Sequence, residues 1–163
     1  MTNLVKYLSV FFVSMVPLIE IRASIPMAYT WCQVADSNLN FVLCCILAIL
    51  GNMIPVPIIY FFARKVLLWG KDKKYIGKFF TFCLEKGEKG GEKLQEKAGR
   101  GLYFALFLFV GIPMPGTGAW TGTLAASILD MDFKKSVIAV VGGVLLAGII
   151  MGILTAGVIA VAI

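Results

Sequence analysis

Apolar residues run along most of the chain in blocks longer than the helices of an ordinary soluble domain. Leu39 to Phe62 has more than 20 residues without a charge, and Ser136 to Ile163 has 28. A helix needs about 20 consecutive apolar residues to cross the hydrocarbon core of a membrane. The two blocks therefore predict two transmembrane spans, which we place at residues 39–63 and 135–163.

Two other apolar blocks are interrupted. The first block, residues 3–19, is interrupted at Pro17. The second block, residues 102–110, has only nine strongly apolar residues, which is too short to cross the membrane, and a segment rich in proline and glycine follows it. Each block resumes after its interruption. This pattern predicts two re-entrant helical hairpins, at 3–35 and 102–130. For the first, a full span with the N-terminus inside is the alternative.

The two interruptions resemble each other. Ile-Pro-Met occurs at 25–27 and again at 112–114, and an aromatic residue follows in each case. Proline removes an amide donor and clashes with a helical carbonyl, so a straight helix through 17–26 is not expected. We predict that new short helices start near Ser24, with Pro26 in the first turn of a helix over about 25–34, and near Thr117.

Spans and hairpins alternate in the order hairpin, span, linker, hairpin, span. The prediction is one all-α integral membrane domain over 1–163, with repeat one at 1–63, a linker at 64–100 and repeat two at 101–163. The two repeats would have opposite orientations in the membrane. In many transporters such inverted repeats form a site near the midplane, where broken helices meet.

Charge is concentrated in the linker. Of fifteen Lys and Arg residues, eleven lie between Arg64 and Arg100, and this window carries the whole net charge of +6. The positive-inside rule places the linker in the cytoplasm. Together with the two predicted spans, this makes the chain a multi-pass protein of the cytoplasmic membrane. The spacing of Ile76, Phe79, Phe80 and Cys83 favours a basic amphipathic helix on the membrane surface.

Composition excludes several classes of function. The chain is 60% apolar and contains no histidine. It has no nucleophile motif, metal constellation or phosphate loop. Adjacent cysteines in an apolar run suit small buried side chains better than a disulfide framework. We therefore expect no enzymatic activity, catalytic residue, metal or cofactor, no nucleic-acid partner, and no ATP-driven pumping by this chain alone.

The breaks nevertheless contain chemistry suited to binding an anion. Free amides at a helix start attract anions, and arginine holds phosphate or carboxylate bidentately. We predict an anionic group bound between 22–26 and 115–119. The predicted substrate-binding residues are Arg22, Ser24, Pro26, Asn52, Pro113, Pro115, Gly116, Thr117, Gly118 and Trp120.

Some of these residues have a second interpretation. Glu20 either binds a proton when substrate engages Arg22, or pairs permanently with Arg22 and pins the hairpin. Asn52 either lines a cavity or makes an interhelical hydrogen bond. Trp120 either lines a substrate path or anchors the chain at a membrane surface. In the last span, Gly148 and Gly152 form a GxxxG pattern, which permits close helix contact within the chain or in a homo-oligomer.

Glu20-Ile-Arg-Ala-Ser-Ile-Pro26 and Gly111-Ile-Pro-Met-Pro-Gly-Thr-Gly-Ala-Trp120 together resemble the small multi-drug export protein family, which is similar to the wider DedA/VTT membrane proteins. The resemblance implies paired re-entrant hairpins. It also implies transport or scrambling of membrane lipids, including polyprenyl phosphates, coupled in places to protons or sodium. The family's acidic and arginine positions would correspond to Glu20 and Arg22.

Three functions follow from these observations. The first is a transporter, flippase or scramblase for an anionic amphiphile such as a phospholipid or polyprenyl phosphate, with Glu20 as the proton switch. The second is a proton-coupled exporter of cationic compounds. The third is a membrane scaffold or channel subunit that does not transport. An enzyme acting on lipid phosphate is the weakest interpretation, because the chain lacks a histidine or an aspartate dyad in a suitable place.

Overall fold

The computed structural model describes residues 2–17, 19–33, 39–72, 77–78, 81, 100–114 and 116–162. Within these ranges all regular structure is helical, as predicted. The helices are α1 (Asn3–Ser14), α2 (Glu20–Cys32), α3 (Phe41–Met53), α4 (Pro55–Lys71), α6 (Arg100–Gly111), α7 (Ala119–Ile128) and α8 (Phe133–Ala162). Most of the predicted linker, including the amphipathic pattern at Ile76, Phe79, Phe80 and Cys83, lies outside the described residues.

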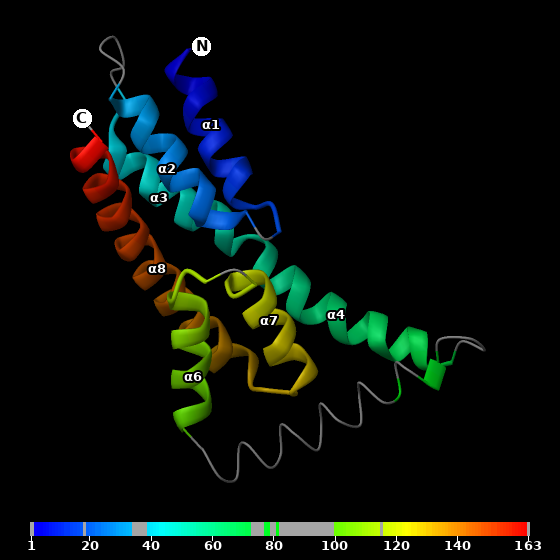
Figure 1. Ribbon diagram of the computed structural model, residues 1–163. Helices are drawn as coiled ribbons and strands as arrows, with labels where there is room; N and C mark the ends of the chain where they lie inside the picture. The colour runs from blue at the N-terminus through cyan, green and yellow to red at the C-terminus, as the bar shows by residue number, and fades with distance from the viewer. Residues whose placement is uncertain are drawn as a thin grey trace.

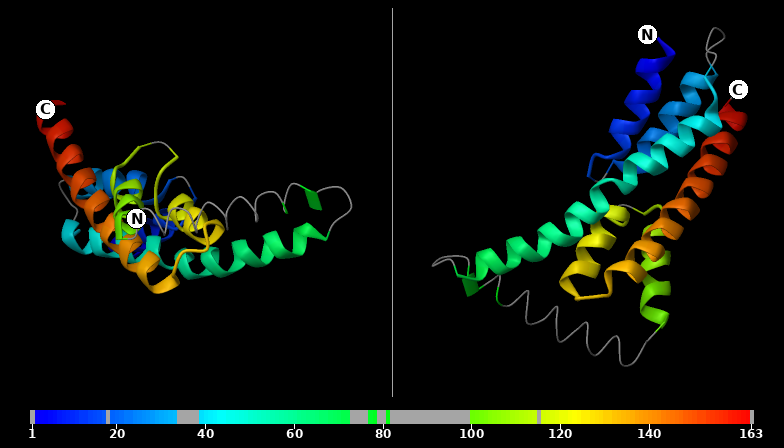
Figure 2. Two further views of the ribbon diagram at one scale, coloured as in Figure 1. Left: turned by 90° about the horizontal axis from the view of Figure 1, so that it is seen from below. Right: turned by 180° about the vertical axis from the view of Figure 1, so that it is seen from behind.

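Two helical hairpins point toward each other (Figure 1). Helices α1 and α2 run antiparallel from one end of the molecule to its middle and back, and α6 and α7 do the same from the opposite end. The second view from behind in Figure 2 shows the same arrangement, with α8 and the α3–α4 pair running along both hairpins. The tips of the hairpins therefore meet halfway along the long helices.

Two helical stretches are long and apolar enough to cross a membrane, at Phe41–Lys71 and Phe133–Val158. They overlap most of the two predicted spans, and the second stretch ends at Val158 rather than at 163. The first continues to Lys71, past the predicted end at 63, because arginine, lysine and leucine sustain a helix and a terminal lysine complements its dipole. Pro55 and Pro57 lie in the first turn of α4, where no intrahelical donor is needed.

The first break differs from its prediction. Helix α2 begins at Glu20, not near Ser24, and Pro26 lies inside it. Glu20 itself has φ 48°, in the left-handed region, and its N–H donates to the Val16 carbonyl at 3.1 Å. The helix can start early because the Glu20 side chain is held from outside by the second hairpin, as described below. The second break agrees with its prediction: α7 starts at Ala119, with Gly118 at its N-cap.

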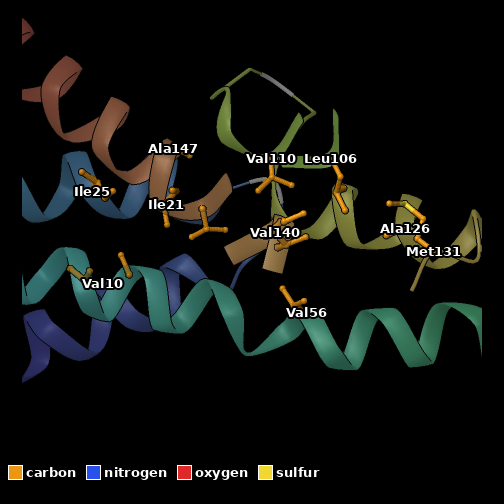
Figure 3. Close-up of a cluster of buried hydrophobic side chains, with 14 of the residues drawn as sticks. Val10, Ile21, Ile25, Val56, Leu106, Val110, Ala126, Met131, Val140 and Ala147 are labelled. Atoms are coloured by element: carbon orange, nitrogen blue, oxygen red, sulfur yellow. The ribbon is translucent and has the colours of Figure 1, made fainter. Parts of the chain in front are cut away.

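The core lies where α8 crosses both hairpins. Ile21 and Ile25 of α2, Val110 of α6 and Val140 of α8 are almost fully buried in it (Figure 3). Glycine brings α8 close to α6, because a side chain at Gly143 would be only 2.7 Å from the Val110 Cβ. Of the two glycines of the predicted GxxxG pattern, only Gly148 faces other side chains of the described chain, those of Ile25 and Ile49, at ordinary van der Waals distance. Gly152 faces open space.

Gly51 sets the distance between α1 and α3, so its replacement should disturb this contact. A methyl group there would overlap the Phe11 carbonyl oxygen and the Ser14 hydroxyl. Because backbone must move to relieve this overlap, Gly51→Ala should destabilise the protein by about 2–3 kcal/mol. Thermal unfolding in detergent measures the loss. Gly152→Ala is the matched control, since it should be neutral or stabilise α8 by about 0.5–1 kcal/mol. Equal melting temperatures for both variants would contradict the packing.

Candidate functional site

The two hairpin tips are joined by Glu20. Its side chain is 3% exposed, and its carboxylate accepts hydrogen bonds from the backbone N–H groups of Ala119 at 3.2 Å and Trp120 at 3.0 Å. These N–H groups are unpaired donors of the first turn of α7, where the helix dipole favours a negative charge. Glu20 of the first hairpin thus caps the N-terminus of a helix in the second.

Arg22, two residues after Glu20, joins the same tips. Its Nη2 donates to the Thr117 carbonyl oxygen and, at 2.8 Å, to the Thr117 hydroxyl. The Thr117 hydroxyl also lies 2.8 Å from the Ile112 carbonyl oxygen and 2.9 Å from that of Met114. Thr117 therefore fixes the shape of the second break and presents an acceptor to the arginine. We call the group formed by Glu20, Arg22 and residues 117–120 the polar crossing.

Glycine makes the polar crossing possible. Gly118 has φ 140°, a conformation that L side chains rarely adopt, and a Cβ there would lie 2.7 Å from the carboxyl carbon of Glu20. Gly116 has φ 84° but open space around it. Gly118 is required both by its backbone conformation and by its close contact with Glu20, whereas Gly116 is required by its backbone conformation alone.

Trp120 connects the crossing to the tip of the first hairpin. Its indole N–H donates to the Met15 carbonyl at 3.1 Å, so both ends of the residue bind the opposite hairpin. One side of its ring lines a groove of about 390 Å³ between α4 and α7, here called the α4–α7 groove. The groove is lined by Pro17, Ile59, Phe62, Ala63, Val66, Trp120, Thr121, Leu124 and Ile128. The sequence indicated Trp120 as a site residue but did not indicate this groove, because the residues that line the groove come from helices far apart in the chain.

The remaining predicted residues lie at different depths. Ser24 and Asn52 are buried, and the Ser24 hydroxyl and both polar atoms of the Asn52 amide have no hydrogen-bond partner. The interhelical hydrogen bond considered for Asn52 is thus not formed. Pro26 and Pro113 are half-buried, on α2 and in the second break. Pro115 lies outside the described residues.

The geometry revises two expectations about charge. Glu20 and Arg22 do not act on each other as a pinning pair: each binds the second hairpin, the carboxylate through N–H donors and the guanidinium through oxygen acceptors. The helix start predicted to attract a ligand anion is occupied by the Glu20 side chain of the same chain. A ligand anion would have to replace this carboxylate.

Polar residues near the far end of α7 have structural roles. The Asp132 carboxylate accepts the Lys135 N–H at 2.9 Å and so caps α8. The Ser127 hydroxyl donates to the Tyr60 carbonyl at 2.7 Å and ties α7 to α4. In the part of the chain that the structure describes, no three Cys, Asp or Glu side chains gather as a metal site would require.

The fold and the polar crossing define a helical membrane protein in which two broken hairpins share one buried polar centre. The chain belongs to the small multi-drug export protein family, whose model matches residues 20–150. The match begins at Glu20 and includes the second break, and the family description is that of a small multi-drug export protein. No curated protein and no solved structure matches the chain at a significant level.

Proposed function

We propose that the chain carries an anionic amphiphile across the membrane, with the polar crossing as the site for its charged group and Glu20 as the proton switch. One observation carries this proposal: the N-terminus of α7 already binds a carboxylate, supplied by Glu20. A phosphate or carboxylate of a substrate has the same charge and accepts the same N–H donors.

Protonation would free this position. A neutral carboxyl group is a weaker acceptor than a carboxylate for donors at the positive end of a helix dipole. When Glu20 takes up a proton, the Ala119 and Trp120 N–H groups become available, and Arg22 lies on the same break to hold a second oxygen. Proton uptake and anion binding would thus occur together, and loss of the proton would expel the anion.

The α4–α7 groove supports an amphiphile over a small hydrophilic anion. Its lining is almost entirely apolar, and Trp120 belongs both to the groove and to the polar crossing. A volume of about 390 Å³ falls within the usual range of ligand sites, about 300–1,000 Å³. An acyl or prenyl chain would lie in the groove while its charged group reached the amides of α7.

The proposal includes a membrane arrangement. The two hairpins would be re-entrant loops of an inverted repeat, entering from opposite faces, with the basic linker 64–100 in the cytoplasm. Their unpaired backbone groups would be tolerated at this depth because they are buried against protein. The hydrogen bonds between the tips would form a closed state that opens to one side at a time.

A second candidate is a proton-coupled exporter of cationic compounds. It is favoured by the family description and by the fact that the Glu20 carboxylate is held by amides, so that no cation neutralises it directly. Arg22 lies on the same break and would repel a cation, which is why we place this candidate second. A membrane scaffold that does not transport is the third candidate.

Replacement of Arg22 separates these candidates. In liposomes, Arg22→Gln should reduce transfer of a fluorescent phosphatidylglycerol by about 10- to 100-fold, since a charge-assisted bond to phosphate contributes about 1.5–3 kcal/mol. Uptake of a cationic dye should not fall. Arg22→Lys, which keeps the charge but not the fork of donors, should lose less. Unchanged lipid transfer, or loss of dye uptake alone, would contradict the anionic assignment.

A further inference from the structure

A second groove lies between α6 and α8, and it shares no residue with the polar crossing or the α4–α7 groove. It has a volume of about 480 Å³ and is called here the α6–α8 groove. It is lined by Tyr103, Phe104, Phe107, Lys135, Ile138, Ala139 and Gly142. Gly142 deepens it, because a side chain there would reach the Phe107 ring at 3.1 Å.

The groove is polar at one end only. The Lys135 ammonium lies 5.7 Å from the centre of the Tyr103 ring, which holds it over the groove mouth by a cation–π contact. The Tyr103 hydroxyl accepts the Asp132 N–H at 3.3 Å, and this bond fixes the ring. The nearby Asp132 carboxylate is engaged in capping α8. Lys135 is exposed, so its charge is available to a ligand.

The rest of the groove is apolar and open to the surroundings. Phe104 is 59% and Ile138 71% exposed. From Lys135 to Gly142 the groove follows seven residues of α8, or about 10 Å. It runs along a helix that is long and apolar enough to cross a membrane, and Lys135 is near the start of that helix. A cation at the end of a membrane helix followed by an apolar groove matches a lipid with a negative headgroup.

We propose that the α6–α8 groove binds an anionic phospholipid, with its phosphate at Lys135 and an acyl chain along Phe104 and Ile138 toward Gly142. The lipid would cover the exposed aromatic face of α6 and hold the foot of the second hairpin against α8. This site is separate from the transport site, and its occupancy does not depend on which substrate is carried.

Photo-crosslinking tests the proposal on the full chain. The protein is placed in phosphatidylcholine nanodiscs doped with a phosphatidylglycerol that carries a diazirine on one acyl chain, and labelled residues are located by mass spectrometry. Labelling should concentrate on Phe104, Phe107 and Ile138, saturate with probe, and be competed by unlabelled phosphatidylglycerol but not by more phosphatidylcholine.

Neighbouring lysines provide the matched control. Both Lys134 and Lys135 are exposed, but only Lys135 lines the groove. One lysine near the membrane surface favours an anionic lipid by about fivefold, so Lys135→Gln should lower labelling by that factor and Lys134→Gln by less than half as much. Ile138→Trp, which fills the groove from an exposed position, should displace the probe without unfolding the protein.

Three results would overturn the proposal. The first is equal labelling of the two lysine variants. The second is equal labelling by a phosphatidylcholine probe. The third is labelling spread evenly over exposed residues of α8 such as Ile149 and Ile153, which would mean that only the general lipid shell contacts this face.

Discussion

Gly118→Ala is expected to separate the two hairpin tips and to produce the largest loss of stability of any glycine replacement in the breaks. The new methyl group would overlap the Glu20 carboxylate, and the residue would be held at φ 140°. Overlap with a buried group and backbone strain each cost about 1–3 kcal/mol, so we expect a loss of about 3–5 kcal/mol. Unfolding by heat or denaturant in detergent measures it.

Two controls assign the loss to its cause. Gly116→Ala meets only open space and should cost about 1–2 kcal/mol from backbone strain alone. In the double variant Gly118→Ala with Glu20→Ala, the overlap is removed, so the two losses should be less than additive by at least 1 kcal/mol. If the losses add, or if Gly116→Ala costs as much as Gly118→Ala, Glu20 does not occupy the position described.

Replacement of Glu20 should separate its structural role from its charge. Glu20→Ala leaves the Ala119 and Trp120 N–H groups buried without an acceptor, which should cost about 2–4 kcal/mol. Glu20→Gln keeps one acceptor oxygen for one of these N–H groups, but it turns its NH2 group toward the other and cannot carry the proton, so it should cost about 1–3 kcal/mol. We expect both variants to lose proton-coupled transport, and Glu20→Ala to lose more stability than Glu20→Gln.

The variants Glu20→Ala and Glu20→Gln can also contradict the roles proposed for Glu20. Glu20→Gln that melts like Glu20→Ala would mean that one remaining hydrogen bond does not hold the tips together and that the whole carboxylate is needed. Glu20→Gln that transports like the wild type at every pH would exclude Glu20 as the proton switch, whatever its effect on stability. The two readouts, melting temperature and transport, are therefore both required.

The sequence predicts the frame of the molecule because membrane helices follow from length and polarity. The two spans and the second break, with α7 starting at Ala119, could be placed from uncharged runs and from glycine and proline. The prediction that residues 22 and 117 come together followed from treating the two breaks as equivalent, and the bond between the Arg22 guanidinium and Thr117 confirms it.

The details of the crossing could not be predicted from local rules. Ser24 was expected to start α2 because serine is a good N-cap, yet the helix begins at Glu20, which is anchored by residues almost a hundred positions away. Tertiary contact here overrides local propensity. For the same reason local rules left a permanent Glu20–Arg22 pair open as one of two interpretations, whereas the hydrogen-bond partners of Glu20 lie on α7.

The two grooves also could not be predicted from the periodicity of apolar residues. The α4–α7 groove depends on Pro17 of the first hairpin lying beside Trp120 of the second, and the α6–α8 groove on a glycine of α8 facing aromatic residues of α6. Apolar patterns indicate which faces are buried or in contact with lipid, but they do not indicate where neighbouring helices leave space between their side chains.

In the proposed mechanism, uptake of a proton by Glu20 and binding of a substrate anion at the start of α7 occur together. The most direct test is the rate at which a fluorescent phosphatidylglycerol crosses the bilayer of proteoliposomes, with and without an imposed pH gradient, for the wild type and Glu20→Gln. We expect the gradient to accelerate lipid transfer by the wild type and to have no effect on the variant. A gradient response that survives in Glu20→Gln, or wild-type transfer that ignores the gradient, would contradict it.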